Sequence, residues 1–330
     1  MPTILDLKFA LKEVTAYFGL FILIIGIIGG ILNVIIFTTL KTFRETTCAF
    51  YLTFASIVGM GQLLTTLFVR ILSDGFSIDP RSMLWFCKTY FFASNWCLSV
   101  WLTSMCLATI DQVLSMSKYR HLSNLRLAQR FILIACIFWF IHSLFTLIYW
   151  DTSSGTCAVF NPIYSIYFSH FTLPVLYGCL PLSILIIFSL LAFYKARTLA
   201  SRNVNVVRLS RDRQLTAMLL VYIGYIVIAI IPFTSFYIYI LNLYTTDPFV
   251  LVSNGLIFTV TILIEYSMYS VAFYIYCCAS ERFRKQLVHV LGNIFFGRWQ
   301  HWINRRNNNQ VLPIITIDVC PTNNKPISIP

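Results

Sequence analysis

Charged residues are scarce in this chain. Only 11% of its 330 residues are Asp, Glu, Lys or Arg, whereas an ordinary soluble domain carries about 25%. Apolar residues make up 58% of the sequence instead. This balance argues against a water-exposed globular surface and indicates that lipid surrounds most of the protein.

Three further patterns are missing from the sequence. Its ten cysteines include no pair with the spacing of a metal site, and no His, Asp and Cys cluster lies in the apolar segments. We therefore expect no metal, no cofactor and no enzymatic activity. The chain also has no internal repeat, which weighs against a transporter built from duplicated halves.

Seven apolar runs dominate the sequence, and each exceeds the ~20 residues that a helix needs to cross a bilayer. Because backbone groups in lipid must bond within their own segment, we expect these runs to be helices. They span Val14–Leu40, Cys48–Leu72, Leu84–Ser115, Ala128–Tyr149, Ile166–Ala196, Leu215–Leu241 and Phe249–Cys278. The predicted fold is thus an all-α membrane protein, a bundle of seven transmembrane helices.

The predicted organisation has four parts. Residues 1–13 form a short extracellular N-terminus, because the first run is too long for a cleaved signal peptide. Residues 14–279 form the bundle. Residues 280–292 place apolar side chains at helical spacing among basic ones, which predicts a short amphipathic helix on the membrane surface. Residues 293–330 are polar and proline-containing, which is typical of a disordered cytoplasmic tail.

The net charge of +12 resembles that of a nucleic-acid-binding protein at first sight, but its distribution fits a membrane protein. If the N-terminus lies outside, only five of the 24 basic residues face outward: Lys8, Lys12, Arg70, Arg81 and Lys88. Such a bias predicts that the C-terminus is cytoplasmic, in a multi-pass protein of the plasma membrane. The expected partner of the basic loops is anionic membrane lipid, and no nucleic acid is expected.

Several single residues occur at characteristic positions along the seven runs. They are Asn33 in the first run, Cys87 at the start of the third, Asp111 and Gln112 at its end, Trp139 in the fourth, Cys157 before the fifth, Pro181, Pro232, Tyr276 and Phe283. In this order and spacing they resemble the motifs of rhodopsin-like G protein-coupled receptors, over about residues 15–291. Several short segments of the sequence are similar to those of invertebrate peptide-receptor-like orphans.

The resemblance implies a function and a covalent link. It implies a receptor that binds an extracellular ligand, either a peptide or a small chemosensory molecule, and signals to a heterotrimeric G protein. It also implies a disulfide between Cys87 and Cys157, which would fix the loop above the ligand pocket. Two free thiols are the alternative, although both cysteines lie on the oxidising side of the membrane.

The inner end of the bundle departs from the family pattern. Gln112 stands where the family has an arginine, and Asp212 stands where its acidic partner often lies. A hydrogen bond could join them, but a salt bridge could not. With Asp111, Arg211, Arg213 and Tyr276, these residues form the expected G-protein-facing switch. Two outcomes remain open: high basal activity, or a receptor-fold protein that binds ligand without coupling.

The interior departs from the pattern as well. Gly59 stands where the family has a sodium-binding aspartate, and Trp101 and Ala272 replace two of its polar partners. We expect Trp101 to fill the space beside Gly59, and sodium to have no effect on ligand binding. A shifted second helix, with Ser56 at that position, is the alternative.

The residue most indicative of a site is Glu265, an acid in the middle of the seventh run. Such residues usually face the interior of the bundle and mark function. It could anchor a cationic ligand group, or be a protonated acid bonded to Ser94, Asn95 or His142. Alignment with the family adds further pocket candidates: Ser94, Asn95, Leu98, His170, Thr172, Phe233 and Phe236. Ser94 in place of an aspartate disfavours amine ligands, and Tyr266 in place of a lysine disfavours retinal.

Overall fold

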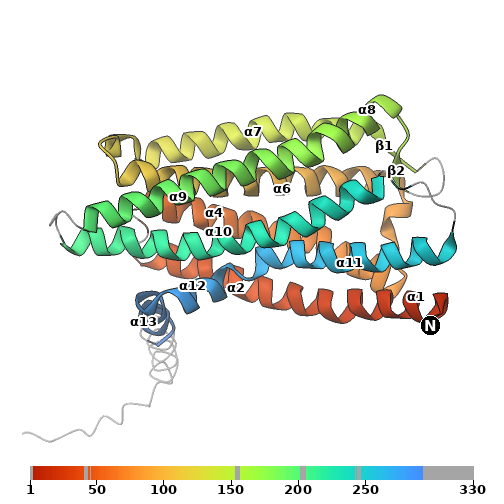
Figure 1. Cartoon of the computed structure of the whole chain (residues 1–330), viewed down its shortest axis with the longest axis horizontal. Helices are drawn as coiled ribbons and strands as arrows, with labels where there is room; N and C mark the ends of the chain where they lie inside the picture. The colour runs from red at the N-terminus through yellow and green to blue at the C-terminus, as the bar shows by residue number, and fades with distance from the viewer. Residues whose placement is uncertain are drawn as a thin grey trace, which may run out of the picture. The chain divides into compact units, whose positions relative to one another are not determined.

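The seven apolar runs form seven helices that are long and apolar enough to cross a membrane in the computed structural model (Figure 1). These spans are Ile4–Thr39, Thr47–Gly75, Leu84–Ser115, Leu125–Tyr149, Pro162–Thr198, Leu215–Leu241 and Pro248–Ser270. The structure describes residues 3–40, 44, 46–152, 157–200, 206–241, 243 and 247–292, without the side chains of 199–200, 206–214 and 282. The protein is therefore an all-α, multi-pass membrane protein, as its composition predicts.

Short irregular stretches divide the spans into smaller elements. The α-helices are α1 (Ile4–Glu13), α2 (Gly19–Thr39), α4 (Thr47–Gln62), α5 (Phe68–Arg70), α6 (Leu84–Ser115), α7 (Leu125–Tyr149), α8 (Pro162–Tyr167), α9 (Leu180–Ala200), α10 (Val206–Leu241), α11 (Pro248–Ser270), α12 (Ala272–Ala279) and α13 (Glu281–His289). Segments of π-helix cover Val14–Phe18, Leu63–Leu67, Ile71–Gly75 and Phe168–Cys179, and short 3-10 turns cover Pro80–Ser82 and Arg120–Leu122. Two short strands, β1 (Trp150–Asp151) and β2 (Ala158–Val159), pair antiparallel.

Among the boundaries that differ from the sequence prediction, two have a cause that the structure shows. The first helix begins at Ile4 rather than Val14, because Thr3 and Asp6 form a capping box that satisfies the free amides of its first turn. The seventh helix is interrupted at Val271, between α11 and α12. There the Ser270 hydroxyl donates a hydrogen bond to the Ile22 carbonyl of α2, 2.9 Å away.

The core of the bundle lies around α6, which is the most buried span, whereas α7 is the least buried. Helix α6 packs against α4, α7 and α9, and α2 packs against α4 and α11. Gly26 permits the last of these crossings, because a Cβ there would collide with Leu63 and Ser270. Many large apolar side chains on the outer faces of the helices are exposed, as expected for surfaces that contact lipid.

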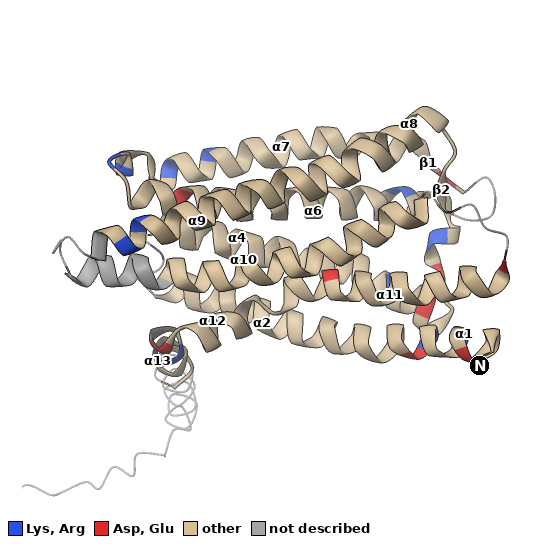
Figure 2. Ribbon diagram, in the orientation of Figure 1, with Lys and Arg blue, Asp and Glu red and all other residues tan. Residues whose placement is uncertain are grey.

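The bundle has two chemically different ends. At one end, which we call the disulfide end, Cys87 at the start of α6 is bonded to Cys157, which directly precedes β2. At the other end, which we call the Gln112 end, α6 finishes at Ser115. Figure 2 shows that charged residues lie mostly toward these ends, whereas the middle of the helices is almost free of charge.

Helix α13 confirms that an amphipathic helix follows the seventh span. Its first turn is capped by the Ser280 hydroxyl, which accepts a hydrogen bond from the Phe283 amide. Phe283 is fully buried, in ring contact with Phe37, Phe273 and Tyr276. The chain divides into two units at this helix, 1–286 and 287–330. The predicted tail, 293–330, lies outside the described residues.

Candidate functional site

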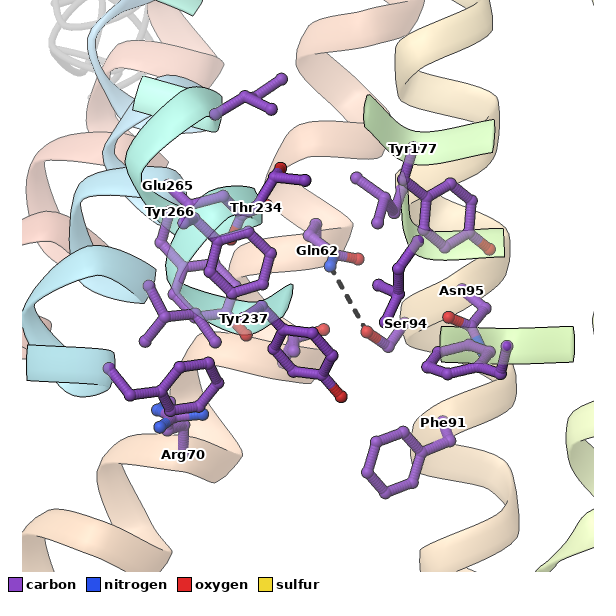
Figure 3. A pocket seen from close by; sticks show the side chains of 18 of the residues that line it. Gln62, Arg70, Phe91, Ser94, Asn95, Tyr177, Thr234, Tyr237, Glu265 and Tyr266 are labelled. Carbon is purple, nitrogen blue, oxygen red and sulfur yellow. Dashed lines mark hydrogen bonds between the residues drawn. The ribbon is translucent and has the colours of Figure 1, made fainter. Parts of the chain in front are cut away.

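A cavity of about 330 Å³ opens inside the bundle toward the disulfide end. Its walls come from α4, α5, α6, α10 and α11 and from the π-helical segment that precedes α9 (Figure 3). This volume lies near the lower limit of the range for small-molecule sites, roughly 300–1,000 Å³. The cavity is therefore the leading candidate for a binding site in the described part of the protein.

The roof of the cavity is covalently tethered. Cys157 lines the cavity, and its bond to Cys87 holds the β1–β2 hairpin against the start of α6, with a Cα–Cα distance of 5.8 Å. Trp150 of β1 stacks on Phe91 of α6, with ring centroids 3.4 Å apart. The disulfide implied by the family resemblance is thus present in the structure, and it helps to hold Cys157 and Trp150, which both line the site.

Polar side chains cross the floor of the cavity. The Gln62 amide nitrogen at the end of α4 donates a hydrogen bond of 3.5 Å to the Ser94 hydroxyl of α6. The Gln62 carbonyl oxygen is buried without a partner among the described residues. Beside them, Tyr177 accepts a hydrogen bond from the Ser99 hydroxyl at 3.2 Å. Figure 3 shows the bond between the Gln62 amide and the Ser94 hydroxyl at this floor.

Glu265 of α11 is buried in the wall of this cavity, as predicted for an intramembrane acid. Its Oε1 accepts a hydrogen bond of 3.3 Å from Tyr269, one turn further along the same helix. The structure thus gives Glu265 a partner on its own helix rather than Ser94, Asn95 or His142. His142 instead lies 3.1 Å from the hydroxyl of Tyr167.

Two arginines that sequence reasoning assigned only to topology line the same cavity. Arg81 binds Asp79 through two nitrogens, at 2.8 and 3.1 Å, and reaches Asp74 at 3.4 Å. The hydrogen bonding from the Arg81 side chain to Asp79 holds the pKa of Asp79 below its usual value. Arg70 approaches Asp74 through Nε at 3.4 Å, with its guanidinium carbon 5.3 Å from the centre of the Phe258 ring.

Aromatic rings form the wall opposite α6. Phe233, Tyr237 and Phe258 have ring centroids 5.7–6.0 Å apart and join α10 to α11. Their faces give the cavity an apolar wall between polar groups, an arrangement typical of small-molecule sites.

The predicted pocket residues divide into two groups. Ser94, Asn95, Leu98, Phe233 and Glu265 all line the cavity. The others lie elsewhere: His170 is exposed and bonds Ser169, Phe236 contacts Tyr239, and Thr172 is buried outside the lining. The π-helical course of residues 168–179 differs from the regular α-helix on which the alignment rests, so the side-chain directions change there.

Sequence reasoning missed several of the polar lining groups. These are Gln62, Arg70, Arg81, Tyr237 and Tyr266. One signal was readable: Arg70 and Asp74 are four residues apart, the spacing of an ion pair on one helix face.

Below the cavity the interior is closed by aromatic packing. Trp101 of α6 lies against Gly59, so a Cβ at Gly59 would be 3.4 Å from the indole nitrogen. The Trp101 ring meets Tyr269 edge to face, with centroids 4.8 Å apart. The prediction that Trp101 fills the space beside Gly59 is confirmed. Tyr269 thus touches both the buried acid of the cavity and the packed interior.

At the Gln112 end a neutral hydrogen bond joins α6 to α10. The Thr216 hydroxyl donates a hydrogen bond to the side-chain amide oxygen of Gln112 at 3.0 Å, and both residues are buried. Asp111 beside it is buried too. The expected partner, Asp212, belongs to α10 together with Arg211 and Arg213, but these three side chains lie outside the described part of the chain.

The remaining motif residues occupy structural positions. Trp139 donates a hydrogen bond of 2.8 Å to Thr103, which joins α7 to α6. The carbonyl of Pro181 lies 3.9 Å from the thiol of Cys106, and Pro232 lies inside α10. Asn33 is buried in α2, and Tyr276 is buried in ring contact with Tyr222.

No group of three or more His, Cys, Asp or Glu side chains within the described residues is arranged to hold a metal ion. No profile of a known protein family matches the chain, and no curated protein sequence matches it significantly. The geometry of the bundle is therefore the basis for any functional assignment.

Proposed function

We propose that the protein is a divergent rhodopsin-like G protein-coupled receptor. The observation that carries this proposal is the combination of a cavity beneath a disulfide-tethered hairpin at one end with a buried contact between α6 and α10 at the other. A ligand that changes the packing of α10 around the cavity can act on that distant contact through the same helix. Coupling of this kind requires one element that both sites bias, and α10 contributes residues to both.

The proposed orientation follows from the basic residues of the sequence. The disulfide end faces the extracellular side of the plasma membrane, and the Gln112 end faces the cytoplasm. The ligand enters from outside, and the cavity volume favours one small molecule or the end of a peptide. Glu265 contacts it by accepting a hydrogen bond from a ligand hydroxyl or amide group.

The resting state is held by the hydrogen bond between Thr216 and Gln112. A neutral hydrogen bond of this kind contributes about 0.5–1.5 kcal/mol, less than a bond to a charged group. We therefore expect a resting state that opens readily, and basal signalling that can be measured without ligand.

A panel of G-protein dissociation assays in cells tests the proposal. The wild type is expected to activate at least one G protein above mock-transfected cells. Thr216→Val removes the donor to Gln112 and is expected to raise basal signalling roughly two- to tenfold. Thr198→Val is the matched control, because the exposed Thr198 bonds the Tyr194 carbonyl of its own helix.

The alternative is a receptor-fold protein that binds ligand without coupling. The observation that favours it is Gln112, which replaces the arginine through which family members meet the G protein. Failure of every G protein to respond to the wild type and to Thr216→Val, at matched surface expression, would contradict the signalling proposal. It would leave this alternative in its place.

A further inference from the structure

Arg70 is the cavity residue whose charge is least satisfied by the protein. Its side chain is only 13% exposed, and it lines the cavity near the disulfide end (Figure 3). Its Nε approaches Asp74 at 3.4 Å but has no hydrogen-bond partner among the described residues. A guanidinium carries five N–H donors in a rigid fork, and among the described residues no hydrogen bond occupies the four donors on the two Nη atoms of Arg70.

The nearby acids do not supply the missing acceptor. Asp79 is held by two nitrogens of Arg81. Asp74 receives the Ser73 hydroxyl at 2.7 Å and also an Arg81 nitrogen at 3.4 Å. Asp74 therefore divides its charge between two arginines, and Arg81 can stabilise it without Arg70.

Glu265 does not neutralise Arg70 by direct contact. No ion pair joins the two among the described residues, and the hydrogen bond to Glu265 comes from Tyr269. A buried carboxyl group can avoid the cost of desolvation by taking up a proton, whereas a guanidinium keeps its charge in any protein environment. The permanent charge that faces the cavity and lacks a full partner is thus positive.

We propose that the cavity selects a ligand with an acidic group, whose oxygens bind the Arg70 guanidinium while its apolar body lies against Phe233, Tyr237 and Phe258. This inference rests on the proposed ligand-binding function and gives the ligand its chemical class. The acid is a carboxylate or similar monoanion, because one fork of donors is open. A small organic acid and the carboxyl end of a peptide share this chemistry.

The cavity walls fit such a body. The Arg70 guanidinium lies over the Phe258 ring at 5.3 Å, so a ligand ring beside Phe258 lies close to the charge. The Gln62 amide donates one of its two N–H groups to the Ser94 hydroxyl, which accepts it. An acid that enters head first toward these floor groups meets only neutral donors, whereas one that stays near Arg70 gains bonds in which both partners are charged.

The test measures thermal stabilisation of the purified full-length protein by defined probes. These are phenylbutyrate, its methyl ester, phenylbutylamine, N-acetylphenylalanine and N-acetylphenylalanine amide. The acids are expected to raise the unfolding temperature, and the ester, amide and amine to raise it less. Stabilisation by N-acetylphenylalanine alone assigns the acid to a peptide end, and stabilisation by phenylbutyrate assigns it to a small molecule.

Variants place the acid at Arg70. Arg70→Gln keeps a polar side chain and is expected to weaken acid binding roughly ten- to hundredfold, the value of a hydrogen bond to a charged group. Arg70→Lys keeps the charge without the fork and is expected to weaken it less. Arg126→Gln makes the same charge change at an exposed site at the start of α7 and is expected to leave binding unchanged.

Three results would overturn the proposal: equal stabilisation by acid and ester, stronger stabilisation by the amine, or no stabilisation by any acid. The comparison of acid with ester uses the wild type, so it holds even if Arg70→Gln does not fold. The readout needs no G protein. Acid binding without signalling would refute the proposed coupling alone, and signalling driven by amines in Arg70→Gln would refute the acid alone.

Discussion

At the scale of single residues, the packing of Trp101 against Gly59 closes the interior below the cavity. Trp101 is 2% exposed and is the largest fully buried side chain in the described bundle. Removal of a buried aromatic ring typically costs about 3–5 kcal/mol. We expect Trp101→Ala to lower the free energy of unfolding by this amount, measured as a lower unfolding temperature of the purified protein.

The control for this prediction lies on the same helix. Trp85 is 65% exposed at the start of α6, so Trp85→Ala removes an equal volume without opening a cavity. A Trp101→Ala protein as stable as the Trp85→Ala protein would show that the indole is not required for packing beside Gly59.

The candidate site was predictable where one residue type carries the signal. Glu265 stands out because an acid is rare in a transmembrane segment. Arg70 was read only as a charge that orients the chain. Its role depends on which face of the helix it occupies and on how Asp74 is shared with Arg81. Arg81 lies in the 3-10 turn that follows the second span, and the sequence pattern does not show that its side chain reaches back to Asp74.

At the scale of elements, the disulfide holds the β1–β2 hairpin against α6. The bond closes a segment with a sequence separation of 70 residues, and a link of this kind typically contributes about 2–4 kcal/mol. We expect Cys157→Ser to lower the unfolding temperature and to weaken binding in the cavity, because Cys157 and Trp150 both line it. Thermal unfolding and probe titration of the same preparations measure the two effects.

The cysteines of the bundle supply the control. Cys136 is an unpaired, half-buried cysteine in α7, so Cys136→Ser tests the loss of a thiol without the loss of a bond. A Cys87→Ser/Cys157→Ser double variant should behave like either single variant. If it is much less stable than both, the thiols contribute separately and the bond is not the source of the effect.

Hydropathy predicted the helices themselves but not where they end. The number and order of the spans follow from the length of the apolar runs, since lipid leaves the backbone few alternatives. The start at Ile4 depends on hydrogen bonds between Thr3 and Asp6, which lie outside any apolar run. The interruption at Val271 occurs next to Ser270, whose hydroxyl bonds α2 far away in the sequence. Such tertiary contacts have no local pattern.

At the scale of the whole molecule, the proposed orientation makes a direct prediction. An epitope tag at the N-terminus should be accessible to antibody on intact cells, and a tag at the C-terminus only after permeabilisation. The reason is the bias of basic residues, five of 24 on the proposed outer side. The opposite labelling pattern would invert the orientation and remove the extracellular access of the cavity.

The two ends of the bundle should also be linked thermodynamically, since α10 lines the cavity and carries Thr216. Suppose that a ligand in the cavity favours the state in which the Gln112–Thr216 bond is broken. Because such coupling is reciprocal, a variant that lacks the bond must then bind the ligand more tightly. Thr216→Val is therefore expected to bind a stabilising acid probe roughly two- to tenfold more tightly than the wild type, and Thr198→Val is expected to bind it equally. Titrations of unfolding temperature against probe concentration measure both affinities. Unchanged affinity in Thr216→Val, together with raised basal signalling, would mean that the cavity and the Gln112 end open independently, and that the probe occupies the site without acting as an agonist.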